Sequence, residues 1–177
     1  MDVGLLDIND STKNERIAIG VTDSIQCLKG NSFDFTYSSS KTYGPAAQVT
    51  WIFGDSQTST ARQPSHTYLD SGTFLVKVKI DEKEGCIDSS DMIVRVIKNP
   101  TALFSTSDSV NCLQGNNILF QNLSKDIGTN PVFIWEFGDG KSTGIKSPNY
   151  VYNGSGNFTI NLIVTGDFGC TDTTSRA

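Results

Sequence analysis

Apolar residues occupy every second position in two long segments of this chain. Alternate positions from 74 to 80 are Phe, Val, Val and Ile, and alternate positions from 158 to 164 are Phe, Ile, Leu and Val. A period of two places these side chains on one face of a β-strand. Each segment is therefore predicted to be a strand with one face buried.

Shorter apolar runs, bounded by Gly, Asn, Asp and Ser, follow one another at intervals of roughly 8 to 12 residues. They predict further strands at Ile17–Val21, Ser32–Tyr37, Val49–Phe53, Met92–Ile97, Ala102–Ser105, Ile118–Gln121 and Val132–Phe137. No stretch has a helical apolar period long enough for a helix. The pattern is typical of an all-β chain folded as antiparallel sandwiches.

The strand pattern occurs twice because the chain is a tandem repeat. WIFGD, beginning at Trp51, corresponds to WEFGD, beginning at Trp135 (135 − 51 = 84), and the same interval relates Gly85-Cys86 to Gly169-Cys170. Upstream of these motifs the interval is one residue longer, since CLKGN from Cys27 corresponds to CLQGN from Cys112 (112 − 27 = 85). A repeat of this length predicts that each copy closes its own core.

The repeat divides the 177 residues into three segments. Residues 11–98 form the first predicted sandwich and residues 99–177 the second, because Pro100 interrupts a strand ladder at the boundary. Residues 1–10 are interpreted as the strand or linker remnant of a preceding repeat.

The two ends of the chain carry a further expectation. The second copy is expected to stop at Ala177 before a final strand like Met92–Ile97 appears, which would leave an unpaired edge and an apolar inner face open to strand addition. Residues 3–8 are expected to be loosely ordered or to pair with the second domain of a neighbouring chain.

Charge and composition exclude several function classes. The formal net charge is −5 and the basic residues are scattered, which argues against binding of nucleic acid. No apolar run approaches the roughly 18 residues of a membrane span. The one imidazole, His66, lies in a predicted strand, and no side chains stand in a nucleophile or paired-acid arrangement, so neither catalysis nor a cofactor is predicted.

The repeated motifs resemble the PKD (polycystic kidney disease) domain family over nearly the full chain. The first copy carries WIFGDS, PSHTY and SGTFLVKV, and the second carries WEFGDG, PNYVY and SGNFTINLIV. Two positions depart from the family pattern: Ser56 replaces the second Gly of the turn, and Tyr150 replaces the His that the first copy keeps as His66. The added cysteines make the chain similar to the variety found in long surface proteins of gliding and type IX-secreting Bacteroidetes.

The resemblance implies two immunoglobulin-like β-sandwiches arranged end to end, in a non-catalytic extracellular protein. The large aromatic residues of the motifs are then interpreted as core rather than as platforms for a ligand; they are Trp51, Phe53, Tyr68, Trp135, Phe137 and Tyr152. If the narrower resemblance holds, Ser24 and Ser109, each in an Asp-Ser-aliphatic triplet, look like O-glycosylation sites. Asp55 and Asp139 are weak candidates for calcium ligands, because the ordinary role of Asp at both positions is to form a turn.

The four cysteines favour disulfides over metal, since no pair has the close spacing of a zinc site. Two pairings remain open. In the internal pairing, Cys27 bonds Cys86 and Cys112 bonds Cys170. In the staggered pairing, Cys27 bonds Cys170, and the other two cysteines bond domains before and after this segment. The second arises because the two turns of one immunoglobulin-like sandwich lie at opposite ends, whereas bonded cysteines must approach to about 6 Å.

Two functions are compatible with these observations. The first is a spacer or adhesion segment of a bacterial surface protein, whose partners are neighbouring repeats and a surface polysaccharide or protein. The second is an accessory binding module beside a secreted hydrolase. A polysaccharide binder needs a flat row of exposed aromatic rings, and the candidates for exposure, Tyr37, Tyr43 and Phe168, lie in different segments. The spacer is therefore favoured.

Overall fold

The computed structural model describes residues 17–82 and 86–177. The interpretation of residues 1–10 and the expectation for residues 3–8 lie outside these ranges. The described chain is all-β, as predicted, with the short 3-10 turn η1 (Asp167–Gly169) between two strands. Within the described ranges, no helix is long and apolar enough to cross a bilayer.

The chain divides into two compact units that do not coincide with the two halves of the sequence. The second unit comprises Val96–Ala177 together with Ile25–Asn31 and Leu69–Gly72, and the first unit comprises the rest of the described chain up to Arg95. The turn that contains Cys27 therefore belongs to the second unit, although in sequence it belongs to the first repeat.

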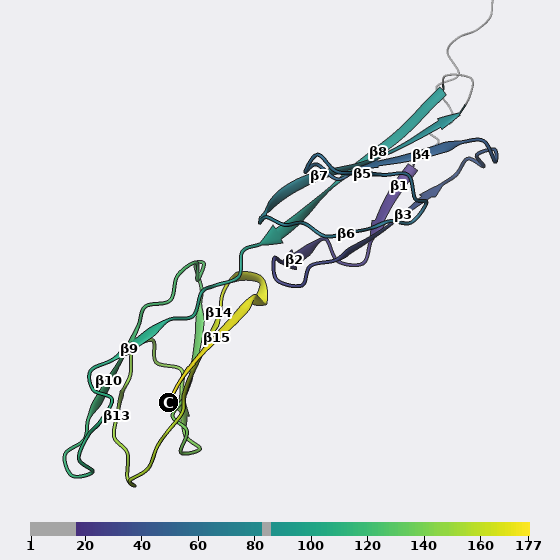
Figure 1. Ribbon diagram of the computed structural model, residues 1–177. Helices are drawn as coiled ribbons and strands as arrows, with labels where there is room; N and C mark the ends of the chain where they lie inside the picture. Colours follow the sequence, from purple (N-terminus) through teal and green to yellow (C-terminus); the bar gives the residue numbers. More distant parts are fainter. Residues whose placement is uncertain (1–16, 83–85) are drawn as a thin grey trace, which may run out of the picture. The chain divides into compact units, whose positions relative to one another are not determined.

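The strands of the first repeat form two sheets (Figure 1). One has the order β1-β3-β6, formed by Ile17–Val21, Phe33–Ser39 and Ser65–His66. The other has the order β2-β8-β7-β4-β5, formed by Ile25–Cys27, Cys86–Ile97, Gly72–Glu82, Gln48–Ile52 and Thr58–Ser59. Every pairing with a described register is antiparallel, as in β4 against β7, where Trp51 lies opposite Val78.

The second repeat has the same two-sheet arrangement. One sheet has the order β13-β10-β9, formed by Asn149–Tyr150, Ile118–Asn122 and Phe104–Thr106. The other has the order β12-β11-β14-β15, formed by Ser142–Thr143, Val132–Glu136, Ile160–Thr165 and Thr171–Arg176. Trp135 lies opposite Leu162, which is the equivalent of the Trp51 and Val78 pair.

Inward-facing side chains of the two sheets make the core of each sandwich. In β7, Val76, Val78 and Ile80 are fully buried, whereas the preceding Leu75 is half exposed and Lys79 is exposed, so the period of two is observed there. In the second repeat, Trp135, Phe120 and Leu162 are buried in one cluster with Phe104 and Phe137. Burial of large apolar side chains is the main stabilising contribution in domains of this size.

The final strand of the second repeat differs from the sequence prediction. A strand does appear after Cys170: β15 pairs with β14 over six residue pairs, from Thr171 opposite Thr165 to Arg176 opposite Ile160. Its residues TDTTSR lack the apolar alternation on which the prediction relied, and backbone pairing to β14 forms the strand nonetheless. A final strand therefore does follow Cys170, whereas the expected open edge for strand addition stays a prediction.

Candidate functional site at the cysteine turns

A disulfide joins Cys27 to Cys170, and both residues lie in the second compact unit. The Cα atoms are 5.5 Å apart, within the range that a disulfide spans. Cys27 ends β2, and Cys170 follows η1, which contacts β2. Neither bond of the internal alternative is present, because Cys27 and Cys170 bond each other and Cys112 is a free thiol.

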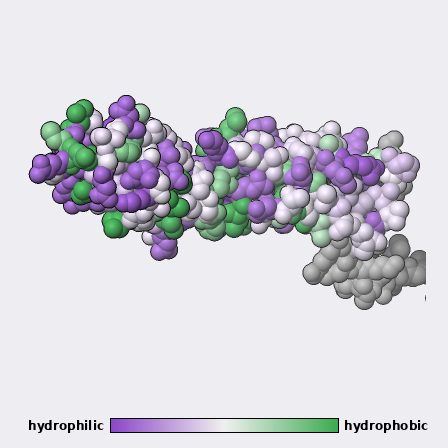
Figure 2. Space-filling view, turned by 90° about the horizontal axis from the view of Figure 1, so that it is seen from below, coloured by the Kyte–Doolittle hydropathy of each residue, from purple (hydrophilic) through white to green (hydrophobic). Residues whose placement is uncertain are grey.

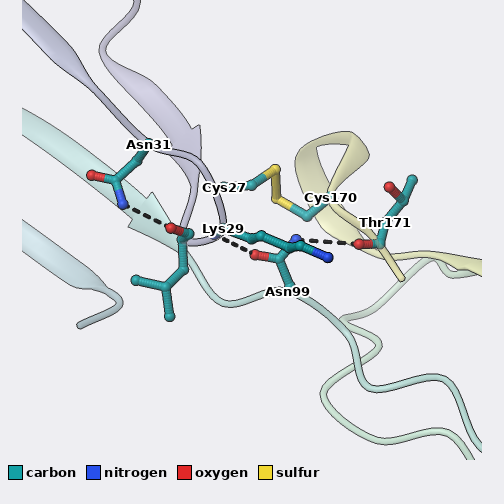
Figure 3. The surroundings of a disulfide bond; sticks show 7 residues. Cys27, Lys29, Asn31, Asn99, Cys170 and Thr171 are labelled. Carbon is teal, nitrogen blue, oxygen red and sulfur yellow. Dashed lines mark hydrogen bonds between the residues drawn. A yellow bond between two sulfur atoms is a disulfide. The ribbon is translucent and has the colours of Figure 1, made fainter. Parts of the chain in front are cut away.

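Asn99 connects the two turns that carry the bonded cysteines. The backbone N–H of Lys29 donates to Asn99 Oδ1 at 2.8 Å, and Asn99 Nδ2 donates to the carbonyl of Thr171 at 3.2 Å (Figure 3). One amide side chain thus fixes the backbone on both sides of the disulfide. Asn99 is not among the residues expected from the sequence, although Lys98-Asn99 repeats Lys13-Asn14 at the interval of 85 residues (99 − 14 = 85).

The turn after Cys27 and the turn after Cys112 have the same structure. Asn31 Nδ2 donates to the carbonyl of Leu28 at 2.7 Å, and Asn116 Nδ2 donates to the carbonyl of Leu113 at 2.6 Å. Both asparagines are buried, and the preceding glycines have φ values of 80° at Gly30 and 77° at Gly115. Positive φ is strained for other residues, so the shared Gly-Asn sequence determines the shared turn.

The surroundings of the two turns differ. Beside the first turn, the N–H of Leu28 donates to the carbonyl of Ile97 at 2.7 Å, which pairs β2 with the end of β8. The equivalent residues 110–112 are not in a strand, and an open pocket of about 640 Å³ lies beside them. Its lining includes Cys112, Asn116 and the core ring of Phe158. Cys112 itself is exposed.

The aromatic residues of the repeated motifs lie in the cores. Trp51 and Trp135 are fully buried, and Phe53 and Phe137 nearly so. The hydroxyl of Tyr68 donates to the carbonyl of Phe53 at 2.8 Å, and the hydroxyl of Tyr152 donates to the carbonyl of Phe137 at 2.9 Å. Burial raises the pKa of both tyrosines, which favours the neutral donor. These rings are unavailable as a platform for a ligand.

The carboxylates of Asp55 and Asp139 each contact a backbone N–H of the following turn and the polar atom of a nearby ring. One carboxylate oxygen accepts the N–H two residues later, from Gln57 at 3.0 Å and from Lys141 at 3.1 Å. The other oxygen contacts His66 Nε2 at 2.8 Å in the first repeat and accepts the Tyr150 hydroxyl at 2.6 Å in the second.

The rings of His66 and Tyr150 also stack on the motif phenylalanines. The centroid of His66 lies 4.0 Å from that of Phe53, and the centroid of Tyr150 lies 3.7 Å from that of Phe137. Tyr150 therefore takes the place of His66 in both contacts. This explains why the histidine of the family pattern is replaceable: the position needs a flat ring with a polar tip.

The weaker candidates from the sequence are not brought together. Both oxygens of Asp55 and of Asp139 are engaged within the protein, and the described residues contain no group of three His, Cys, Asp or Glu side chains that could hold a metal ion. Ser24 and Ser109 are exposed, each just before a cysteine turn.

A family model of the PKD domain matches this chain twice, at residues 15–97 and 98–177. The chain belongs to the PKD domain family. Its members are non-catalytic modules, and the two matches cover both sandwiches described above. The tandem arrangement inferred from the 84-residue interval is confirmed by these two matches, and so is the immunoglobulin-like fold, since two sheets form the sandwich of each repeat.

Two curated relatives that match parts of this chain are much longer proteins. The chain is 34% identical to the pre-pro-metalloprotease PrtV of Vibrio cholerae over 62 residues, which are 34% of this chain and 7% of the relative. It is 28% identical to human polycystin-1-like protein 1 over 116 residues, which are 64% of this chain and 4% of the relative. The chain thus spans a small fraction of either protein.

The solved structures that match this chain include a PKD domain. The PKD1 domain of the Vibrio cholerae metalloprotease PrtV is 23% identical and matches 46% of this chain and 95% of that domain, with a TM-score of 0.39. The insect immune protein hemolin is 13% identical and matches 94% of this chain and 47% of its own, with a TM-score of 0.45.

The described surface of the PKD repeats has no aromatic row. Of the three aromatic residues proposed from the sequence, Phe168 is 62% exposed, whereas Tyr37 and Tyr43 are half-buried. The Tyr43 hydroxyl donates to Asp88 at 3.1 Å. On the face drawn in Figure 2, hydrophobic residues form separate groups among hydrophilic ones. Scattered apolar side chains are usual on a soluble surface.

Proposed function

We propose that this chain is a non-catalytic spacer and adhesion segment of a long extracellular or cell-surface protein. The observation that supports the proposal is that the motif residues of both PKD repeats are used for packing and turn formation, which leaves the loops and the exposed polar faces of the strands as the contact surface. Its partners are neighbouring repeats of the same protein and a surface protein or polysaccharide. The disulfide supports an oxidising compartment.

The proposal extends to the source of the surface protein. The cysteine pattern and the repeated Asp-Ser-aliphatic triplets favour a surface protein of the gliding, type IX-secreting Bacteroidetes kind. Ser24 and Ser109 would then carry O-linked glycans, and their exposure is compatible with this. Mass spectrometry of the protein purified from its own cells tests the assignment, because unmodified peptides at both serines would contradict it.

Antibody labelling of intact cells tests the extracellular location. We expect antibodies raised against this chain to label cells before permeabilisation, and the label to be lost when the protein is shaved from the surface by protease. Labelling that requires permeabilised cells would overturn the proposal.

The alternative function, an accessory binding module beside a secreted hydrolase, is favoured by the match to a metalloprotease. Affinity electrophoresis in gels that contain polysaccharide separates the two functions. An accessory polysaccharide binder would be retarded, and Phe168→Ala would abolish the retardation because Phe168 is the exposed aromatic ring. Leu69→Ala is the matched control, since Leu69 is an exposed apolar residue elsewhere. For a spacer we expect no retardation that depends on Phe168.

A further inference from the structure

Cys112 occupies a turn that is already folded like the turn of the bonded Cys27. The two turns share the Asn side-chain bond to the carbonyl three residues earlier and the glycine of positive φ. Cys27 is half-buried and bonded, whereas Cys112 is exposed and free. An exposed cysteine alone does not define a site. Here the equivalent residue of the same molecule, Cys27, is bonded to Cys170, which shows the kind of group that a turn of this structure bonds.

Besides the bond of Leu28 to Ile97, two elements of the following repeat hold the turn of Cys27. The first is the turn before β15, in which Gly169 has a φ of 79° and Cys170 follows it. The second is Asn99, which precedes the first strand of its repeat and accepts the N–H of Lys29. Both elements belong to one PKD repeat, residues 98–177.

The sequence of the first repeat contains the same two elements. Gly85-Cys86 corresponds to Gly169-Cys170, and Lys13-Asn14 corresponds to Lys98-Asn99. The sequence of each repeat therefore contains an acceptor turn, CLKGN or CLQGN, and a donor set, which is a Gly-Cys pair with a Lys-Asn segment. The Cys27 to Cys170 bond joins the acceptor turn of the first repeat to the donor set of the second repeat. The acceptor turn of the second repeat and the donor set of the first repeat take no part in this bond.

We propose that the Cys112 turn is a covalent docking site for another PKD repeat of this type, which bonds Cys112 through the cysteine of its own Gly-Cys turn. For this chain the occupant is a second copy, which supplies Cys86 and Asn14 from its first repeat. The inference rests on the proposed function, because it names the partner of a spacer built from such repeats. Repetition of the bond joins each repeat covalently to the next in a long array.

Formation of the bond is a two-electron oxidation. The thiolate of Cys112 attacks a disulfide oxidant, either an exported thiol oxidoreductase or oxidised glutathione, and releases one thiol of the oxidant. The thiolate of the partner cysteine then attacks the mixed disulfide at Cys112 and releases the second thiol. The two proteins lose two protons and two electrons, which the oxidant gains.

Two variants of the full chain test the pairing. Cys86→Ser leaves Cys112 as the reactive thiol, and Cys112→Ser leaves Cys86, while both retain the Cys27 to Cys170 bond. The variants are incubated in a buffer of oxidised and reduced glutathione, each alone and then mixed, and covalent dimers are measured on non-reducing gels. Docking raises the effective concentration of the correct thiol pair, so we expect the mixed dimer to form about tenfold faster than either homodimer.

A displaced thiol is the matched control. Cys86→Ser/Cys112→Ser/Ile145→Cys carries one thiol at another exposed position of the second repeat. It should form mixed dimers with the Cys112→Ser variant no faster than homodimers. In the donor, Asn14→Ala should slow the mixed dimer without removing a thiol.

Equal rates for the mixed dimer and the homodimers, or equal rates for the Cys112 acceptor and the displaced-thiol control, would overturn the docking site. Peptide mapping that places Cys112 on a second Cys112 would do the same. Such a result leaves the spacer function standing, because surface labelling and polysaccharide retardation test that function without any use of Cys112.

Discussion

At the scale of single residues, the two PKD repeats differ most informatively at Ser56 and Gly140. Both residues occupy the left-handed region, with φ values of 74° and 85°, in the turn that follows the motif Asp. A Cβ at Gly140 would meet no atom within 4 Å, so the backbone conformation, and not space, sets the preference for glycine. Ser56 therefore bears strain that Gly140 avoids.

Exchange of these two residues gives a paired prediction. Ser56→Gly should raise the free energy of unfolding of the first repeat, and Gly140→Ser should lower that of the second, each by about 1 kcal/mol. Calorimetry of the two variants checks both signs. If both substitutions changed stability in the same direction, left-handed strain would not be the cause.

The two buried tryptophans give a second prediction at this scale. Trp51 and Trp135 are fully buried, and their indole N–H groups have no hydrogen-bond partner among the described residues, so packing alone accounts for their contribution. Trp51→Ala or Trp135→Ala should destabilise its own repeat by about 3–5 kcal/mol. Lys79→Ala, on the exposed face of β7, should change stability by less than about 0.5 kcal/mol. Unchanged melting of Trp135→Ala would show that the ring is not part of the core.

At the scale of elements, the contact of Tyr150 with Asp139 connects β13 to the turn after β11. The hydrogen bond from the Tyr150 hydroxyl is the main cause that lowers the pKa of Asp139 below its usual value of 3.8. Burial, and then the bond to Asp139, raises the pKa of Tyr150 to about 12. The neutral tyrosine and the charged aspartate therefore stabilise each other in the folded state.

A pH dependence follows from the lowered pKa of Asp139. The contribution of charged Asp139 to the free energy of unfolding is fully present above the pKa of the unfolded chain. It is lost as the pH falls through the lower pKa of the folded state, because the unfolded chain binds the proton more readily. Tyr150→Phe removes the donor, so the second repeat of this variant should lose less stability between pH 5 and pH 2, a window that spans the usual pKa of an Asp side chain, about 4. Melting temperatures measured across this window check the prediction. Parallel curves for the two proteins would contradict it.

Strand positions were largely predictable from the sequence, and the exceptions have physical reasons. β7 follows its apolar alternation, whereas β14 begins at Ile160 although the alternation begins at Phe158. Phe158 instead stacks on Tyr152 at 4.1 Å, so a ring contact, not a strand ladder, explains its apolar character. β15 shows the reverse case, a polar segment that forms a strand because β14 offers it backbone partners.

At the scale of the whole molecule, the Cys27 to Cys170 bond is the longest-range constraint that the structure shows. It joins residues 143 positions apart in the chain. A cross-link over so long a loop removes much of the conformational freedom of the unfolded chain, which the chain-entropy model values at about 5 kcal/mol as an upper figure.

Reduction and chelation should therefore differ in their effect on the melting temperature. We expect a reducing agent to lower the melting temperature and a metal chelator to leave it unchanged. Cys27→Ser/Cys170→Ser should reproduce the effect of reduction, and Cys112→Ser should melt like the parent chain because its thiol is free. A chelator that lowers the melting temperature, or a reductant without effect, would contradict this account.

The sequence alone determined the strand pattern and the tandem repeat, because local periodicity and the repeat interval record them directly. The resemblance of its motifs to the PKD family added the fold, the core aromatics and the two possible cysteine pairings. Tertiary structure decided between the pairings, placed residues 25–31 in the second unit, and revealed that Asn99 bridges Lys29 and Thr171. These facts depend on atoms separated by 70 or more positions, whose approach no local pattern encodes. The sequence identifies the cysteine and amide side chains that are able to bond, and the packing of the chain decides which of them come into contact.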